Sequence, residues 1–471
     1  MTWKDYIVIL QPELFIIAII VVLLLIKIGS DGWGRNQFLY FINALLLLNF
    51  LGALVFQPEG HLFHEMYKAN RLTNIEKSIL SAGVLLISLQ SWSWLKFHKH
   101  AEEFYMLLLS SLLGMFFMIS SNNLLQFYLG LELSTIPLAA ICNFDLDKRE
   151  SSESAMKLIL NSAFSSGLLL MGISFVYGAT GSLNFTEITP KLESSTLLLF
   201  AFVLLTSGFG FKISAVPFHL WTADVYQGAP VPVTSYLSVI SKGSLFFVFV
   251  SVLYTLFKPL SNDWYPVICL LAILTMVVGN LFALRQTNIK RLLAFSSIAQ
   301  AGFILVGISA NSVVGLSSVV YFILVYIFSN LGAFGVVSVI SACTGKENIN
   351  DYRGLYKTNP LLAWVLAISL FSLAGIPPTA GFFGKFFLLI AGAARNNYSL
   401  IIIAALNMVV SLYYYLVLVK TIFLNGDDSK METLPIPMLS RIALLICVAG
   451  ILVLGLYGNV YDYIQSVCSN F

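Results

Sequence analysis

The stretch that decides the fold is STLLLFAFVLLTSGFGFKISAVPFHLW, residues 195–221. About 20 apolar residues cross a bilayer as an α-helix, and this run is long enough to do so with one lysine, Lys212, inside it. Pro217 then interrupts the helix, because its ring nitrogen cannot donate a hydrogen bond to the carbonyl of Ile213. The sequence therefore predicts a membrane-spanning helix that is broken beside a buried lysine.

The composition of the whole chain agrees with a membrane location. Of its 471 residues, 58% are hydrophobic and only 10% are charged, whereas a soluble domain carries about 25% charged residues. A chain with so little charge cannot cover its surface in water. The net charge of +3 gives no reason to expect nucleic acid as a partner.

Similar apolar runs recur along the chain and predict an all-α polytopic membrane protein with about fourteen transmembrane helices. Only Ser120–Asn123 separates the fourth predicted span from the fifth. The N-terminus lacks the features of a cleaved signal peptide, so the first span is expected to be retained. The predicted spans are 5–28, 37–57, 75–95, 103–120, 122–142, 153–180, 195–217, 230–256, 264–283, 291–309, 313–341, 360–390, 398–424 and 439–458.

Basic residues in the predicted loops indicate an orientation. Loops after odd-numbered helices carry 14 lysines and arginines, among them Lys96, Lys148, Lys346 and Lys430, and the opposite loops carry 7. Because lysine and arginine favour cytoplasmic loops, both termini are predicted to lie on the non-cytoplasmic side.

Several function classes lack their usual signatures. The five cysteines form no C-x-x-C motif and the five histidines form no metal-ligand cluster, so we expect no disulfide, no metal and no bound redox centre. The sequence contains neither a P-loop nor a Rossmann fingerprint, which argues against a nucleotide site.

A faint repeat divides the chain. Leu124-Leu125-x-Phe127 resembles Leu292-Leu293-x-Phe295, and proline breaks follow at Pro217 and at Pro377-Pro378. Paired broken helices in two halves indicate a transport site near the middle of the membrane. The predicted units are N-terminal helices over 1–102, five-helix repeats over 103–256 and 257–424, and a C-terminal helix and tail over 425–471.

Five charged residues fall well inside the predicted spans: Glu132, Lys157, Lys212, Lys242 and Lys385. Each costs roughly 2.5–3.5 kcal/mol at the centre of a membrane helix, so such residues are functional candidates by default. Lys157 lies only four residues into its helix, which favours a structural role.

Two neighbours of the first break leave alternatives open. His219 lies two turns beyond Lys212 and is either an interior histidine or part of a relay. Asp224 lies near the end of the same element and either caps the turn before Pro230 or contributes to the site. One buried acid and three buried bases suit a relay in which a lysine loads a proton as a carboxylate approaches and releases it as the carboxylate leaves. A static scaffold of ion pairs is the structural alternative.

Four stretches carry a resemblance to a known family. The sequence resembles subunit N of the proton-pumping NADH:quinone oxidoreductase, respiratory complex I, over nearly its whole length; the wider family includes subunits L and M and the Mrp cation/proton antiporters. A sodium/proton antiporter of the Mrp type is therefore a second functional alternative. The stretches are FYLGLELSTIPLAA (127–140), GFGFKISAVPFHLWTADVYQGAPVPVTSYLSVISKG (208–243), NIKRLLAFSSIAQAGF (288–303) and SLAGIPPTAGFFGKF (372–386).

The resemblance implies an inverted relation between the two five-helix repeats and a proton relay. It implies that Glu132, Lys212, Lys242 and Lys385 form the central axis. Secondary positions would be His219, Asp224, Lys157, Lys290 at the cytoplasmic end, and Gln300, where many relatives carry histidine. A glutamine can join a hydrogen-bonded path but cannot titrate, which leaves a histidine-type relay there in doubt.

The resemblance also implies a setting. NADH, FMN, iron–sulfur clusters and quinone would be bound by partner subunits and not by this chain. The partners would be membrane-arm subunits of the M, K, J, A, H and L types, and the location would be a bacterial inner membrane.

Overall fold

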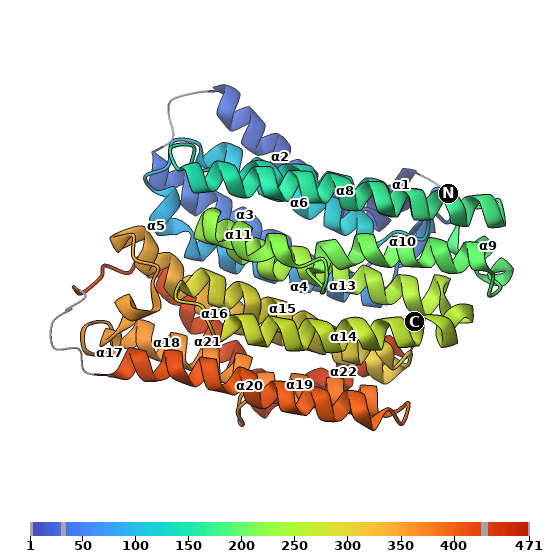
Figure 1. The fold of residues 1–471 in the computed structure, drawn as a ribbon. Coiled ribbons are helices and arrows are strands. Elements are labelled where there is room, and N and C mark those ends of the chain that lie inside the picture. The colour runs from blue at the N-terminus through green and yellow to red at the C-terminus, as the bar shows by residue number, and fades with distance from the viewer. Residues whose placement is uncertain (1–2, 30–33, 425–431, 470–471) are drawn as a thin grey trace.

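Apolar runs form long, roughly parallel helices in the computed structural model, which describes residues 3–29, 34–424 and 432–469 (Figure 1). Within this part of the chain, 13 helical segments are long and apolar enough to cross a membrane. The pair α18 (Pro360–Ala374) and α19 (Ala380–Ala393) supplies one further, broken span. The prediction of about fourteen spans is confirmed.

The spanning segments follow the predicted runs within a few residues. Residues 231–256 form one segment built from α12 (Val231–Tyr236), the π-helical turn η2 (Leu237–Ser241), α13 (Lys242–Ser251) and a second π-helical turn η3 (Val252–Leu256). The others are α2 (Gln11–Gly29), α3 (Arg35–Val55), α4 (Arg71–Gln90), α6 (Ala101–Ile119), α7 (Leu124–Cys142), α8 (Arg149–Thr180), α10 (Thr196–Ile213), α14 (Ser261–Ala283), α15 (Ile289–Ser309), α16 (Val313–Thr344), α20 (Tyr398–Phe423) and α21 (Met438–Leu456).

Short elements connect or cover the spans. A small hairpin pairs β1 (Gly60–Leu62) with β2 (Tyr67–Ala69). The remaining short helices are α1 (Trp3–Ile9), α5 (Trp92–Leu95), α9 (Phe185–Ile188), η1 (Thr189–Lys191), α11 (Leu220–Gly228), η4 (Lys258–Leu260), η5 (Ile349–Tyr352), α17 (Leu355–Thr358) and α22 (Asn459–Cys468).

Two predicted spans are interrupted. The span 5–28 divides at Leu10 into α1 and α2, because Pro12 has no N–H for the carbonyl of Val8. The span 75–95 divides at Ser91 into α4 and α5. By contrast, Ser120–Asn123 does separate two helices, since α6 ends at Ile119 and α7 begins at Leu124.

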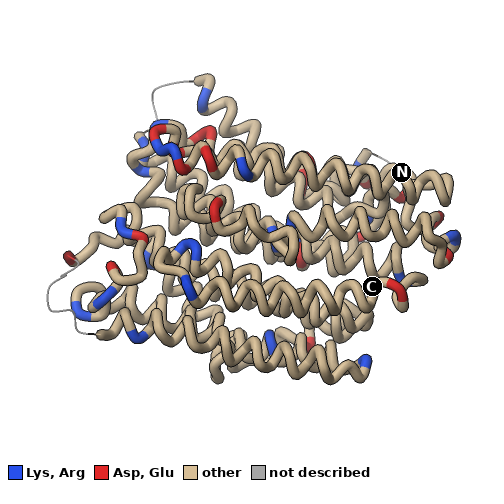
Figure 2. Tube along the Cα trace, in the orientation of Figure 1, with Lys and Arg blue, Asp and Glu red and all other residues tan. Residues whose placement is uncertain are grey.

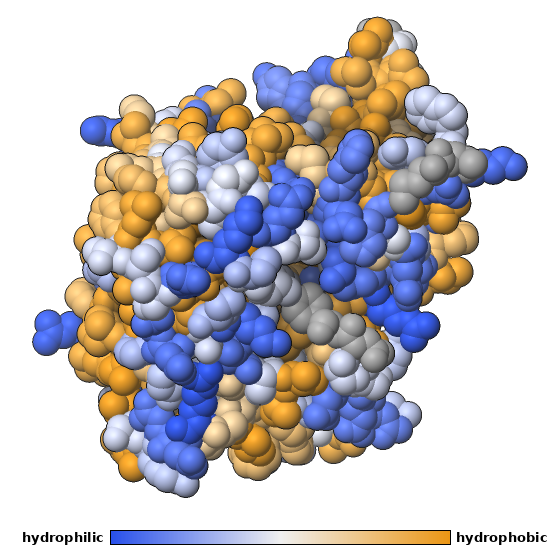
Figure 3. Space-filling model, turned by 90° about the vertical axis from the view of Figure 1, so that its right-hand side faces the viewer, coloured by the Kyte–Doolittle hydropathy of each residue, from blue (hydrophilic) through white to orange (hydrophobic). Residues whose placement is uncertain are grey.

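Charged residues gather at the two ends of the bundle, and only a few lie between them (Figure 2). Both termini lie at one end, opposite α5 and α17 (Figure 1). We call the end that holds the termini the terminal end. Lys430, one of the lysines used to predict orientation, lies outside the described residues. Viewed end-on, hydrophilic side chains run across the middle of the bundle and hydrophobic ones lie around its edge (Figure 3), as expected for a protein surrounded by lipid.

The helix order repeats in the two predicted five-helix units. The first unit comprises α6, α7, α8, α10–α11 and α12–α13, and the second comprises α14, α15, α16, α18–α19 and α20. In each unit the third helix has 32 residues and the fourth is broken, at Pro217 and at Pro377-Pro378 respectively. The same order of helices in both units supports the predicted boundaries at residues 103, 257 and 425, which stay a prediction.

Candidate functional site

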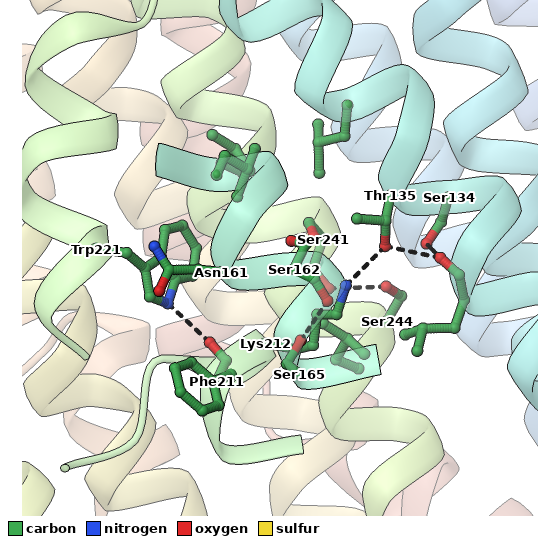
Figure 4. Close-up of a pocket in the computed structure, with 15 residues that line it drawn as sticks. Ser134, Thr135, Asn161, Ser162, Ser165, Phe211, Lys212, Trp221, Ser241 and Ser244 are labelled. Atoms are coloured by element: carbon green, nitrogen blue, oxygen red, sulfur yellow. Dashed lines mark hydrogen bonds between the residues drawn. The ribbon is translucent and has the colours of Figure 1, made fainter. Parts of the chain in front are cut away.

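Lys212 lies in the last turn of α10, immediately before the first break. Ser214 ends α10 in a left-handed conformation with φ 63°, and the buried Lys212 ammonium donates to the Thr135 hydroxyl of α7 over 3.0 Å. A cavity of about 30 Å³ adjoins the lysine, which is room for a water molecule. Serine side chains line much of this cavity (Figure 4): Ser134, Ser162, Ser165, Ser241 and Ser244.

Glu132 lies three residues before Thr135 on α7 and is half-buried. Its Oε1 is buried without a hydrogen-bond partner. In the described part of the chain it forms no ion pair within 4.0 Å, although its charge acts on Lys212. The neighbouring Leu133 and Ile136 are exposed, so α7 presents Glu132 near the outer face of the bundle. The structure thus places the two residues near each other without joining them directly.

Lys242 begins α13 directly after the π-helical turn η2. Such turns occur often at functional sites, because the extra residue displaces a side chain from the regular helix face. The buried Lys242 ammonium donates to the Ser297 hydroxyl of α15 over 2.7 Å and lies 5.3 Å from the centre of the Tyr226 ring. The side chain therefore points from the first five-helix unit into the second.

One face of α15 continues this polar contact. Ser296, adjacent to Ser297, shares a very short hydrogen bond with the Tyr415 hydroxyl of α20. Gln300, one turn further, donates from Nε2 to the same Tyr415 hydroxyl over 3.3 Å and to the carbonyl of Leu373 over 3.1 Å. Sequence analysis singled out Gln300 but could not foresee these partners, which lie 115 and 73 residues away.

Lys385 lies five residues into α19, just beyond the second break. Its buried ammonium donates to the carbonyl of Leu373 over 2.7 Å and to that of Ala374 over 3.4 Å. These carbonyls belong to the last turn of α18, where an α-helix leaves its acceptors unsatisfied. Lys385 and Gln300 therefore meet at one atom, the Leu373 oxygen, and polar groups extend from Lys242 to Lys385.

His219 lies between the two parts of the first broken helix, directly before α11. Its imidazole is buried, and neither ring nitrogen has a hydrogen-bond partner in the described part of the chain. An unpartnered buried imidazole is costly unless water reaches it. The structure brings His219 into the interior but does not connect it to a lysine by a direct hydrogen bond.

Asp224 and Lys157 belong to a peripheral ion-pair network. The Lys157 ammonium lies 2.7 Å from Glu153 and 2.6 Å from Asp224, and Asp224 also lies 2.8 Å from Arg291. Asp224 and Lys157 are more than a third exposed. The network joins α8, α11 and α15 at the surface, which fits the structural role expected for Lys157.

Lys290 lies at the start of α15, at the end opposite the termini. Its ammonium is 2.8 Å from Glu347 and donates to the carbonyl of Ala229 over 3.4 Å. A cavity of about 390 Å³ adjoins it, lined also by Asp145 and Glu150. A hydrated cavity lined by acids and bases can exchange protons with bulk water.

Together these groups can hold and pass protons between donors and acceptors inside a membrane. No group of three potential metal-ligating side chains occurs in the described ranges. The axis comprises hydroxyls, amides, carbonyls and ammonium groups on helices far apart in sequence, and groups of these kinds can bind and release protons or hydrogen-bond to water.

Comparisons with known proteins identify the family. The family described as NADH:quinone oxidoreductase/Mrp antiporter, TM matches residues 121–411. NADH-quinone oxidoreductase subunit N of Phocaeicola vulgatus is 44% identical over 97% of both chains. The chain belongs to the NADH-quinone oxidoreductase subunit N family.

Solved structures agree with this family. A chain of respiratory complex I from Thermus thermophilus with bound aureothin is 28% identical, with a TM-score of 0.82 over 95% of this chain and 97% of that one. A chain of the Mrp complex from Dietzia sp. DQ12-45-1b has a TM-score of 0.87 at 18% identity, covering 100% of this chain and 98% of that one. The second likeness shows a shared fold.

One ionisable cluster was missed by sequence analysis and lies outside the region 121–411 that matches the subunit N and Mrp family. Lys77 and Glu13 form an ion pair of 2.6 Å and are both 1% exposed, and the Tyr67 hydroxyl donates to Glu13 over 2.8 Å. Glu76, beside Lys77, is also buried. The prediction of five deeply placed charges was therefore incomplete. Glu76 and Lys77 lie at the start of the predicted span 75–95 and were not weighed as interior groups, whereas Glu13 lies well inside the span 5–28 and was overlooked.

Proposed function

We propose that this chain carries protons across the membrane as a subunit of an NADH:quinone oxidoreductase, and that Glu132, Lys212, Lys242 and Lys385 form its relay. The observation that supports this most strongly is the row of polar contacts along α15: Ser297 accepts from Lys242, and the adjacent Ser296 belongs to the group of contacts that reaches Lys385. Buried ammonium groups in a membrane are expensive. A structural role would be met by ion pairs, whereas Lys212, Lys242 and Lys385 have hydroxyls and carbonyls as partners.

The two halves of the relay handle protons differently. The serine-lined cavity has room for water beside Lys212 and Thr135, and Glu132, one turn from Thr135 on α7, exchanges protons with Lys212 from there. The buried imidazole of His219 contributes between Lys212 and Lys242. From Lys242 the proton passes to the hydroxyls of α15 and α20. Hydroxyls accept and donate at once, and because no hydrogen bond joins Ser297 to Ser296 or Tyr415 among the described residues, a water molecule has to complete the step between them.

Gln300 positions this part of the path. Its amide does not titrate, so it orders the Tyr415 hydroxyl and the Leu373 carbonyl and leaves proton exchange to Lys385 and to water. Lys290 and its hydrated cavity form the uptake side. Asp224 and Lys157 hold the helices beside the first break as a supporting ion-pair network.

The setting follows from the family and the charge pattern. The uptake end, opposite the termini, faces the cytoplasm, and both termini lie on the other side of a bacterial inner membrane. Partner subunits of the membrane arm flank the chain, including those of the M and K types. NADH, FMN, iron–sulfur clusters and quinone are held by other subunits, where redox chemistry supplies the driving force.

The deciding variant is Lys242→Met in the complete complex, in sealed membrane vesicles. Methionine keeps the volume and removes the proton-binding group. We expect NADH oxidation to continue and the number of protons moved per NADH to fall. The matched control is Lys420→Met, because Lys420 is exposed on α20 and should be replaceable. A parental proton-to-NADH ratio in Lys242→Met would contradict the relay.

The same preparation distinguishes the alternatives. Proton movement that continues without NADH and requires a sodium gradient would indicate exchange of the Mrp type. Loss of the complex in Glu132→Gln, with unchanged pumping by whatever complex remains, would indicate a structural scaffold.

A further inference from the structure

Lys77 and Glu13 form a buried ion pair between α2 and α4, in which Glu13 Oε1 accepts both hydrogen bonds and Oε2 has no partner among the described residues. Lys77 donates to Glu13 over 2.6 Å and to the Tyr67 hydroxyl over 3.0 Å, and Tyr67 donates to the same Glu13 oxygen. The positive and negative charges of Lys77 and Glu13 cancel within this group. It therefore has no charge left to compensate a further buried ion.

Glu76 is such a further ionisable group. It is 1% exposed, and its Oε1 has no hydrogen-bond partner in the described part of the chain. Among the described residues, no lysine, arginine or histidine nitrogen lies within 4.0 Å of its carboxylate oxygens. An ionised carboxylate in this position costs several kcal/mol, whereas a neutral carboxylic acid costs much less. The Glu76 side chain can therefore be buried at low cost only while it is protonated.

The position of Glu76 connects it to the relay. Leu80 and Gly83 follow it at spacings of four and seven, which puts the three residues on one face of α4. A Cβ built on Gly83 would lie 2.3 Å from Ile240, in the π-helical turn before Lys242, and one built on Gly243 would lie 3.8 Å from Leu80. Glu76 lies roughly 10 Å along α4 from Gly83, at 1.5 Å per residue, toward the terminal end.

The short helix α22 covers this end of α4. Its buried face includes Ile464, Val467 and Cys468, and it packs against α4 and α16. The helix α22 thus lies over the end of α4 that carries Glu76, and water that reaches Glu76 from the terminal end has to pass it.

We propose that Glu76 is a further proton-carrying residue of this chain, between the relay at Lys242 and the terminal-end surface. This inference rests on the proposed function. In the exchange the carboxyl O–H bond breaks as the proton passes to water on the terminal side, and it forms again when water from the Lys242 side delivers another proton. No other bond changes.

The test is Glu76→Gln in the complete complex, measured as protons moved per NADH oxidised in sealed vesicles. Glutamine keeps the shape but cannot release a proton. We expect normal assembly, continued NADH oxidation, and a loss of pumping as large as that of Lys242→Met. Glu76→Asp, which keeps a carboxyl group, should recover at least half of the lost pumping. The matched control is Glu102→Gln, since Glu102 is half-buried and paired with Arg35 over 2.8 Å at the opposite end.

Each other outcome overturns the inference. A parental ratio in Glu76→Gln shows that no proton needs this carboxyl group. An assembly defect in this isosteric variant assigns Glu76 to packing. If Lys242→Met lowers pumping and Glu76→Gln does not, only this inference fails; if Lys242→Met also pumps normally, the proposed function fails first.

Discussion

Both broken helices carry a buried lysine beside the interruption, but the two lysines have different partners. At the first break, Lys212 stands before the interruption, binds a hydroxyl of another helix and adjoins a cavity. At the second break, Lys385 stands after the interruption and binds backbone carbonyls of the preceding half-helix. Lys212 is thus held by a side chain of another helix and adjoins a cavity, whereas Lys385 is held by the backbone at the end of the preceding half-helix.

The close approaches at the two breaks show the same contrast. A Cβ on Gly381 of α19 would lie 1.8 Å from the carbonyl oxygen of Ser372 in α18, whereas one on Gly210 of α10 would lie 2.6 Å from the Phe218 ring. Backbone cannot move aside, but a half-buried ring can. The second break is therefore a rigid acceptor site, and the first is a site where water and side chains can rearrange.

The largest expected effect comes from filling these two close approaches. Gly381→Ala should abolish assembly of the complex, because overpacking against fixed backbone costs about 3 kcal/mol or more. Gly210→Ala should assemble, with at most a modest loss of stability, because Phe218 can rotate. The measurement is the amount of intact complex in membranes of each variant. Equal amounts in the two variants would remove the distinction between a rigid and an adaptable break.

Replacing each lysine with methionine sharpens the comparison. Both variants lose a buried charge, but only Lys385→Met leaves carbonyls at a helix end without their charged donor. A hydrogen bond to a charged group contributes about 1.5–3 kcal/mol. Lys212→Met loses one such bond, to Thr135, and Lys385→Met loses two, to Leu373 and Ala374, so the Lys385→Met complex should unfold at a lower temperature. Pumping should fall in both. Thermal unfolding of the purified complexes measures the difference, and a more stable Lys385→Met complex would contradict the capping role of Lys385.

Gln300 tests whether the second break works through its shared carbonyl. Gln300→Leu removes the donor to Tyr415 and Leu373 while keeping most of the volume. It should lower the proton-to-NADH ratio measurably, and this loss should be several-fold smaller than the loss in Lys385→Met. Gln300→His should retain most pumping, because an imidazole can donate to one of the same oxygens. If leucine pumps as well as glutamine, α15 does not carry the connection from Lys242 to Lys385.

Much of the fold was predictable, because its determinants are local. Runs of apolar residues predicted the spans, and the prolines inside two of these runs predicted both breaks. The structure corrected two details. The interruption at Leu10 follows from Pro12, a local signal that the prediction of one span over 5–28 did not use, whereas the π-helical turn before Lys242 depends on packing and leaves no simple signal in a run of apolar residues.

The candidate site was predictable only in part. Lys212, Lys242 and Lys385 stood out because a charge inside an apolar run is conspicuous. Their partners did not, since Ser297 and Leu373 are ordinary residues whose role depends on helices 55 and 12 positions away. Glu76 and Lys77 were missed because depth was judged from distance to the end of a span, whereas burial there is set by α2 and α22.

The smallest expected effect concerns the surface beside the first break. Asp224 pairs with Lys157 and Arg291, but it is 38% exposed, and exposed ion pairs contribute about 0–1 kcal/mol. Asp224→Asn should therefore shift thermal unfolding by no more than a few degrees and leave pumping near the parental value. The matched variant is Glu153→Gln, which removes only the more exposed partner of Lys157 and should have still less effect. A strong loss of pumping in Asp224→Asn, with assembly intact, would move Asp224 from the supporting network into the relay. The adaptable first break would then extend from the cavity at Lys212 to the bundle surface.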